Sequence, residues 1–153
     1  MNSMYIRNNN VTIETLNIEG TLAGWSGYGG INNQGGKINT INVKQGGKIE
    51  QGVRNNNGTI QTLTISGGTI NGGITNNKTI QTLTINNGTI NGNITNNGSN
   101  ASTGAINIKG TSSVSGSIVN QNGATFNNQI TLDANSKLGG ITNNANSTMS
   151  GTL

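Results

Sequence analysis

Residues 59–77 read TIQTLTISGGTINGGITNN, and residues 79–97 repeat them twenty positions later as TIQTLTINNGTINGNITNN, with sixteen of nineteen positions identical. A fixed period of about twenty residues, rich in Ile and Thr, is shorter than any repeat built from a pair of helices and matches one turn of a β-helix. The two segments therefore predict a solenoid in which each repeat forms one coil and stacks on the next.

The apolar residues inside one repeat have the spacing of short strands with one buried face. Segments 63–65 and 70–74 place aliphatic or glycine residues at every second position, which is the period of a strand. We interpret the three-residue step 60–63 and the segment 66–68 as corners. Three strands and three corners per coil predict an all-β, right-handed parallel β-helix with a roughly triangular cross-section.

The same period continues on both sides of the near-identical pair. We predict about six to seven coils of roughly 20–25 residues in a single domain, with residues 1–10 as an N-terminal extension and residues 24–30 as a loop insert. The coils are predicted at residues 12–36, 37–58, 59–77, 79–97, 104–123 and 124–144, with a partial seventh from residue 145. Aligned in this way, every coil contributes an aliphatic residue to each of four inward columns. The columns are Leu16, Ile41, Leu63, Leu83, Ile106 and Ile130; Ile18, Val43, Ile65, Ile85, Ile108 and Leu132; Leu22, Ile49, Ile70, Ile90, Val114 and Leu138; and Ile31, Val53, Ile74, Ile94, Ile118 and Ile141.

An asparagine follows each member of the last column by two residues. These are Asn33, Asn55, Asn76, Asn96, Asn120 and Asn143. Continued alternation turns them inward at a corner, where a side-chain amide can bond the backbone of the turn and its equivalents in neighbouring coils. We predict a structural asparagine ladder and prefer it to a polar binding stripe.

Composition excludes several classes of function. The chain has no Cys and no His, which removes disulfides, thiol catalysis and the commonest metal ligand. Its net charge of +4 arises from basic residues spread along the chain, so no nucleic-acid-binding patch is predicted. No apolar run is long enough to span a membrane. The start MNSMYIRNNN lacks the regions of a signal peptide, and we interpret the chain as a segment of a longer protein.

Carboxylates are too few for the usual catalytic arrangements on a β-helix. Glu14, Glu19, Glu50 and Asp133 are the whole set, and the predicted register brings no two of them face to face. A glycosidase needs such a pair, and a calcium-dependent lyase needs an acidic cluster. We therefore predict a non-catalytic protein with no metal and no cofactor.

Two groups of outward residues are candidate contacts for a ligand or partner. Trp25 and Tyr28 lie in the glycine-rich insert, where exposed aromatic rings could stack on a sugar or anchor a partner; covering of hydrophobic surface is the preferred interpretation. Thr62 and Thr64, with Thr82 and Thr84 in the next coil, form the Thr-x-Thr array that some ice-binding solenoids present. Only two of six coils keep this pair, and strand propensity also explains it.

Units such as GTINGNITNNG at residues 88–98, joined by Asn- and Gly-rich corners, resemble the passenger domains of bacterial autotransporters, especially adhesin-like ones of epsilonproteobacteria such as Campylobacter and Helicobacter. The resemblance covers roughly residues 11–153 and concerns the style of the repeat. It implies a β-helix displayed outside the bacterial outer membrane after export through a C-terminal β-barrel, and it transfers no functional residue.

We therefore expect a surface-displayed structural or adhesive stalk. Its partners would be a host surface glycan, a host protein or further copies of the chain. The alternatives are an ice-binding solenoid and a component of a phage or filament fibre.

Overall fold

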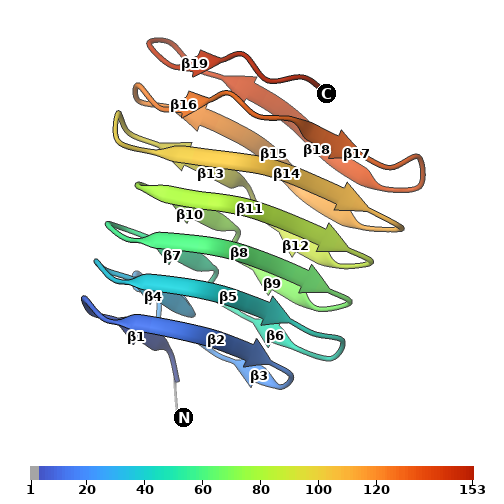
Figure 1. Cartoon of the computed structure of the whole chain (residues 1–153). Helices are drawn as coiled ribbons and strands as arrows, with labels where there is room; N and C mark the ends of the chain where they lie inside the picture. Colours follow the sequence, from blue (N-terminus) through green and yellow to red (C-terminus); the bar gives the residue numbers. More distant parts are fainter. Residues whose placement is uncertain (1–3) are drawn as a thin grey trace.

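The computed structural model describes residues 4–153, and these wind into a stack of coils made of short strands (Figure 1). The strands are β1 (Ile6–Asn8), β2 (Thr12–Ile18), β3 (Thr21–Leu22), β4 (Ile31–Asn33), β5 (Lys37–Val43), β6 (Lys48–Ile49), β7 (Val53–Asn55), β8 (Thr59–Ser66), β9 (Thr69–Asn71), β10 (Ile74–Asn76), β11 (Thr79–Asn86), β12 (Thr89–Asn91), β13 (Ile94–Asn97), β14 (Ser102–Lys109), β15 (Ser113–Gln121), β16 (Thr125–Phe126), β17 (Ile130–Leu132), β18 (Lys137–Asn143) and β19 (Thr148–Met149). All pairings between these strands are parallel. The predicted β-helix is confirmed.

Each of the first four coils contributes one long strand and two short ones, as β8, β9 and β10 do. The long strands β2, β5, β8, β11 and β14 build one sheet, which β16, β17 and β19 extend. The short strands build the other sheet, in which β15 joins the row of β9 to the row of β10. In Figure 1 the long strands run in front from left to right and the chain returns behind them as the coils rise, which makes the coil right-handed as predicted.

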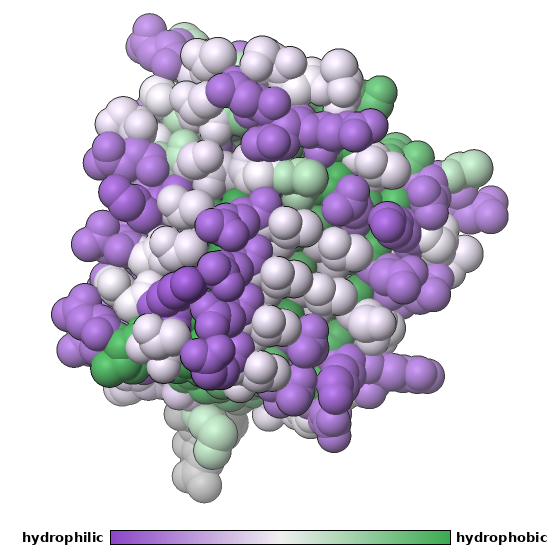
Figure 2. All heavy atoms as spheres, in the orientation of Figure 1, coloured by the Kyte–Doolittle hydropathy of each residue, from purple (hydrophilic) through white to green (hydrophobic). Residues whose placement is uncertain are grey.

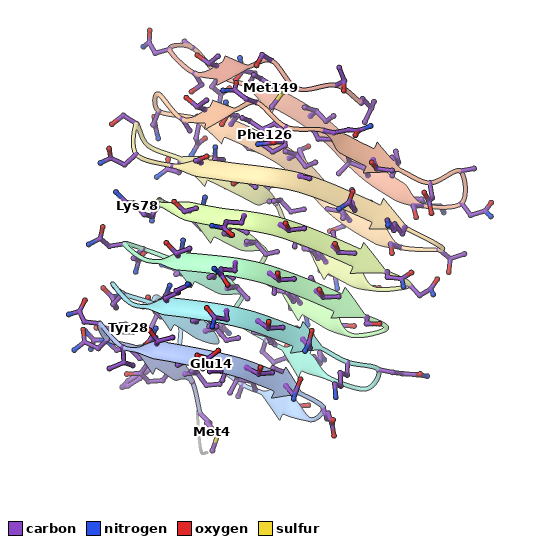
Figure 3. The ribbon with its side chains drawn as sticks, viewed as in Figure 1. Met4, Glu14, Tyr28, Lys78, Phe126 and Met149 are labelled. Carbon is purple, nitrogen blue, oxygen red and sulfur yellow. The ribbon has the colours of Figure 1, made fainter. Side chains whose placement is uncertain are left out.

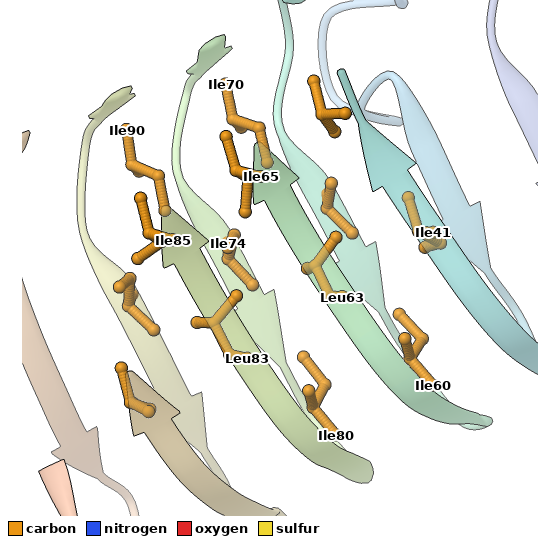
Figure 4. Packing of buried hydrophobic residues seen from close by; sticks show 14 of the residues in the cluster. Ile41, Ile60, Leu63, Ile65, Ile70, Ile74, Ile80, Leu83, Ile85 and Ile90 are labelled. Atoms are coloured by element: carbon orange, nitrogen blue, oxygen red, sulfur yellow. The ribbon is translucent and has the colours of Figure 1, made fainter. Parts of the chain in front are cut away.

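The four predicted columns are confirmed by the pairing register. Leu63 pairs with Leu83 and Ile65 with Ile85 across β8 and β11, and Ile74 pairs with Ile94 across β10 and β13. Figure 4 shows Leu63 and Leu83, and Ile65 and Ile85, in corresponding positions of neighbouring coils. The members from coils two to five are buried, and the end coils are more open, with Leu132 and Ile141 exposed. Stacking thus concentrates a small apolar content into one continuous core.

A fifth inward column runs along the start of the long strands. It contains Ile13, Ile38, Ile60, Ile80, Thr103, Phe126 and Met149. Phe126, the only phenylalanine, is fully buried in this column, directly below Met149 in the view of Figure 3.

Two of the predicted local features are wrong. No corner separates Ile60 from Leu63, because β8 continues through both residues and both are buried. Gln61 has no paired residue in β11, so β8 is irregular at this position. This irregularity explains why the buried residues Ile60 and Leu63 are three residues apart instead of two. The bend lies instead at Gly72 and Gly73, where we had predicted an uninterrupted strand. Their φ angles of 90° and 78° lie in the region that favours glycine.

The register predicts opposite outcomes for two neighbouring substitutions in β8. Ile65→Asp places an unpaired carboxylate in the core and should cost at least about 3 kcal/mol of unfolding free energy. Thr64→Asp, which turns outward, should stay within about 0.5 kcal/mol of the parent. Urea unfolding of both variants measures the difference, and equal losses would contradict this register.

Candidate functional site

A ladder of asparagine amides is the most extensive polar arrangement inside the coils. Each Nδ2 donates to the Oδ1 of the corresponding asparagine in the next coil toward the C-terminus. The distances are 2.8 Å from Asn8 to Asn33, 2.9 Å from Asn33 to Asn55, 2.9 Å from Asn55 to Asn76, 3.1 Å from Asn76 to Asn96, 2.9 Å from Asn96 to Asn120 and 3.0 Å from Asn120 to Asn143. The predicted asparagine ladder is confirmed, and Asn8 adds a rung to it.

Backbone carbonyls fix the orientation of these amides. The Nδ2 of Asn55 also donates to the carbonyl of Gly58 in its own turn at 2.8 Å and to that of Thr79 in the next coil at 2.9 Å. The Nδ2 of Asn120 bonds the carbonyls of Ala124 and Thr148 in the same way. If an amide were flipped, its Oδ1 would face these carbonyl oxygens, which cannot donate a hydrogen bond. All amides of the ladder therefore donate in the same direction, toward the next coil on the C-terminal side.

Asn8 was missed because residues 1–10 were interpreted as an extension preceding the first coil. In the structure, Ile6–Asn8 forms β1 and pairs with β4. The sequence did contain a signal, since residues 6–8 have the same pattern of an aliphatic residue, any residue and asparagine that precedes every later rung.

A second row of amides follows the ladder on the outer side of the same corner, and its direction is reversed. Here Nδ2 or Nε2 donates toward the N-terminal coil: Asn56 to Asn32 at 3.0 Å, Asn77 to Asn56 at 3.1 Å, Asn97 to Asn77 at 2.9 Å, Gln121 to Asn97 at 3.1 Å and Asn144 to Gln121 at 3.4 Å. Unlike the buried ladder, most of these side chains are half-exposed. The corner is therefore held by two amide rows of opposite direction.

The predicted aromatic contacts belong to a cluster of three rings. Trp25 lies 5.9 Å from Tyr5 and 5.7 Å from Tyr28, and Tyr5 lies 6.2 Å from Tyr28, all measured between ring centroids. Trp25 is 54% exposed and Tyr28 49% exposed. Figure 3 places Tyr28 beside the first coils. Sequence reasoning missed Tyr5, because only the tertiary structure brings β1 beside the insert.

Backbone hydrogen bonds hold the insert in this position. The amide N–H of Gly24 donates to the carbonyl of Met4 at 2.7 Å, and those of Tyr28 and Gly29 donate to the carbonyl of Trp25 at 2.9 and 3.0 Å. The insert is thus an ordered turn attached to the N-terminal segment, and its half-exposed rings can accept a flat apolar ligand face.

The four predicted threonines lie in register on the long-strand sheet. Thr62 pairs with Thr82 and Thr64 with Thr84, and all four side chains are half-buried. The row formed by Thr62 and Thr82 also continues toward the N-terminus through Thr40. Figure 2 shows this face covered by hydrophilic and intermediate side chains.

The four carboxylates lie apart, each bonded to a separate partner. Glu14 accepts a hydrogen bond from Asn39, Glu19 pairs with Lys44 at 3.3 Å, and Asp133 accepts from the backbone N–H of Gly110 at 2.9 Å. Glu50 accepts hydrogen bonds from Lys48 at 2.9 Å and from Asn71 at 3.0 Å, and these lower the pKa of its carboxyl below its usual value. Within residues 4–153, no three acidic, His or Cys side chains gather as a metal site would require.

One polar hollow was not anticipated from the sequence. It has a volume of about 350 Å³ and lies along the corner of the first coils, where Lys37 and Lys78 line it together with Thr12 and Thr59. Figure 3 shows Lys78 at this corner. The hollow contains two cationic side chains and no carboxylate.

Comparison with protein-family models, with curated proteins and with solved structures gives no match for this chain. The part of the chain described by the structure contains no helix long and apolar enough to cross a membrane.

The two amide rows predict unequal costs for removing neighbouring asparagines. Asn76→Ala removes one hydrogen-bond partner from each of the buried amides of Asn55 and Asn96 and from the carbonyl of Ser102, and should cost roughly 1–3 kcal/mol. Asn77→Ala breaks bonds that water can replace and should cost less than about 1 kcal/mol. Thermal and urea unfolding test both variants. A larger loss for Asn77→Ala would mean that the outer row, and not the buried ladder, contributes most to the stability of the corner.

Proposed function

We propose that this chain is a structural rod of an autotransporter-like passenger, displayed outside the bacterial outer membrane and non-catalytic. The observation that carries the proposal is the continuity of the asparagine ladder from Asn8 to Asn143. A ladder and core that cross every coil couple all coils into one stiff unit, as a stalk requires.

The outward surface supports a spacing role. Outward positions are mostly Thr, Asn, Gln and Lys, and the described carboxylates are each engaged separately. Adhesive contact is assigned to the cluster of Tyr5, Trp25 and Tyr28, because rings that are half-exposed and held by backbone bonds can stack on a sugar face of a host glycan.

Labelling of intact cells tests the location of the chain, and glycan binding tests the contact. An antibody against the chain should label intact cells of the source organism without permeabilisation. Purified, labelled chain should bind sugars on a glycan array. Trp25→Ala combined with Tyr28→Ala should weaken that binding by about thirtyfold, since stacking on each of the two rings contributes on the order of 1 kcal/mol.

Thr62→Ala combined with Thr82→Ala is the matched control, because it alters the opposite sheet and should leave glycan binding unchanged. Labelling only after permeabilisation would contradict surface display. Glycan binding that survives loss of both rings would remove the aromatic cluster from the adhesive role while leaving the structural one.

An ice-binding solenoid is the second candidate, favoured by the threonines that lie in register on the long-strand sheet. In that case the purified chain would show thermal hysteresis, and Thr62→Lys combined with Thr82→Lys would abolish it by disrupting the row. We expect no hysteresis, because the row that contains Thr64 and Thr84 continues into Asn42 on one side and Asn107 on the other. A hysteresis gap lost in the lysine variant would favour this second function over the stalk.

A further inference from the structure

The polar hollow beside the asparagine ladder exists because two consecutive coils carry glycine at the same corner position. Gly36 and Gly58 directly precede the long strands β5 and β8. A Cβ on Gly36 would collide with the backbone of Val11, and a Cβ on Gly58 would collide with the backbone of Gly36. Backbone therefore forms the floor of the hollow, and the next side chain in this column is that of Lys78, directly before β11.

Two lysines flank this floor. Lys37 begins β5 and pairs with Thr59, which pairs in turn with Thr79. Lys78 directly precedes Thr79, so the Cα atoms of the two lysines are about two strand spacings apart, on the order of 10 Å. Both lysine side chains are exposed, and Gly58 and Thr59 lie between them. Because a lysine has a long, flexible stem, both ammonium groups can reach one anion that lies over Thr59.

Positive charge is in excess at this corner. Within residues 4–153, the ion pairs are Lys44 with Glu19 and Lys48 with Glu50, and both lie beyond the other end of the long strands. Glu14, the carboxylate closest to the hollow along the long strands, accepts a hydrogen bond from Asn39. Four basic side chains without an ion pair stand on or next to the strands that enter and leave the ladder corner: Arg7, Lys37, Arg54 and Lys78.

The groups around the two lysines suit a sugar. Asn10, Thr12 and Asn57 line the hollow with exposed amide and hydroxyl groups, which can exchange hydrogen bonds with sugar hydroxyls. Ammonium groups bind sulfate and carboxylate through charge-assisted hydrogen bonds. None of the described residues that line the hollow is aromatic, so it lacks the rings on which nucleic-acid bases stack.

We propose that this hollow binds an acidic polysaccharide, with a sulfate or carboxylate group between Lys37 and Lys78 and neighbouring sugar hydroxyls against Asn57 and Thr59. The lining residues come from four successive coils, so the site extends along the stack and fits a chain of linked sugars. The aromatic rings of the insert do not line it. The proposal is therefore independent of the aromatic contact and of surface display.

Heparin, which carries both sulfate and carboxylate groups, is the probe for this site. Immobilised heparin should bind the purified chain at low salt and release it as the salt concentration rises, because salt screens the lysines and competes for the polyanion. Lys37→Gln combined with Lys78→Gln should weaken binding about tenfold at fixed ionic strength, since two charge-assisted contacts are lost. Lys37→Arg combined with Lys78→Arg keeps both charges and should keep the binding.

Lys109→Gln combined with Lys137→Gln is the matched control. It removes the same net charge from exposed side chains beyond the other end of the long strands, and should change the affinity less than about twofold. Equal losses for the two double variants would mean that heparin responds only to the net charge of the chain, and would overturn the proposal. Absence of heparin binding at low salt would overturn it as well.

A carboxylate introduced between the lysines tests where the anion lies. Thr59→Glu should abolish heparin binding, because its carboxylate occupies the place of the ligand's anionic group. Thr84→Glu adds the same charge farther along the long strand of the next coil, and should have little effect. Similar losses for the two variants would place the anion outside the hollow and contradict the proposal.

Two further probes determine the class of ligand. Heparin stripped of its sulfate groups keeps its carboxylates, so retained binding would assign a carboxylate to the hollow and lost binding a sulfate. Single-stranded DNA of equal charge should bind at least about tenfold more weakly, because the hollow offers no stacking platform. Equal binding of DNA would overturn the assignment to a polysaccharide. Trp25→Ala combined with Tyr28→Ala should leave heparin binding unchanged, so this site and the aromatic contact succeed or fail separately.

Discussion

The whole structure depends on keeping each coil in register with the next. A parallel pair of strands whose side chains repeat at the same positions can stack like on like, so isoleucine meets isoleucine and asparagine meets asparagine. The asparagine ladder makes this condition strict, because a slip of one residue would turn the amide outward and place the preceding outward residue in the core. Register is therefore enforced at the corner by hydrogen bonds and along the walls by packing.

This constraint acts on the strands and leaves the connections free to vary. Eight residues separate β3 from β4 in the first coil, whereas Gly72 and Gly73 alone separate β9 from β10. Ile31 still pairs with Val53, and Asn33 with Asn55. A loop inserted at a bend does not disturb the core when the strand that follows it keeps its place in the same column. The loop of residues 24–30, which carries Trp25 and Tyr28, is such an insertion, so exposed aromatic side chains are added without disturbing the stack.

A repetitive stack also differs from a globular core at its ends. Inside the rod most polar and aliphatic side chains have partners in both neighbouring coils, while the first and last described coils have a neighbour on one side only. The ladder gives the stack a direction, because each amide donates to the corresponding asparagine of the next coil toward the C-terminus. A rod of this kind thus has chemically distinct ends even though its coils are alike.

The sequence by itself determined the period, the four aliphatic columns and the six predicted rungs of the ladder, because side-chain alternation and like-on-like stacking are local and repeat visibly. The sequence also predicted the corner at residues 66–68, but only the tertiary structure showed that the strand continues past Gln61 and bends at Gly72 and Gly73. The tertiary structure also decided the direction of the ladder, which depends on turn carbonyls, and the meeting of Tyr5 with Trp25, which lie twenty residues apart in the chain. Such features arise from contacts between coils and have no local signal.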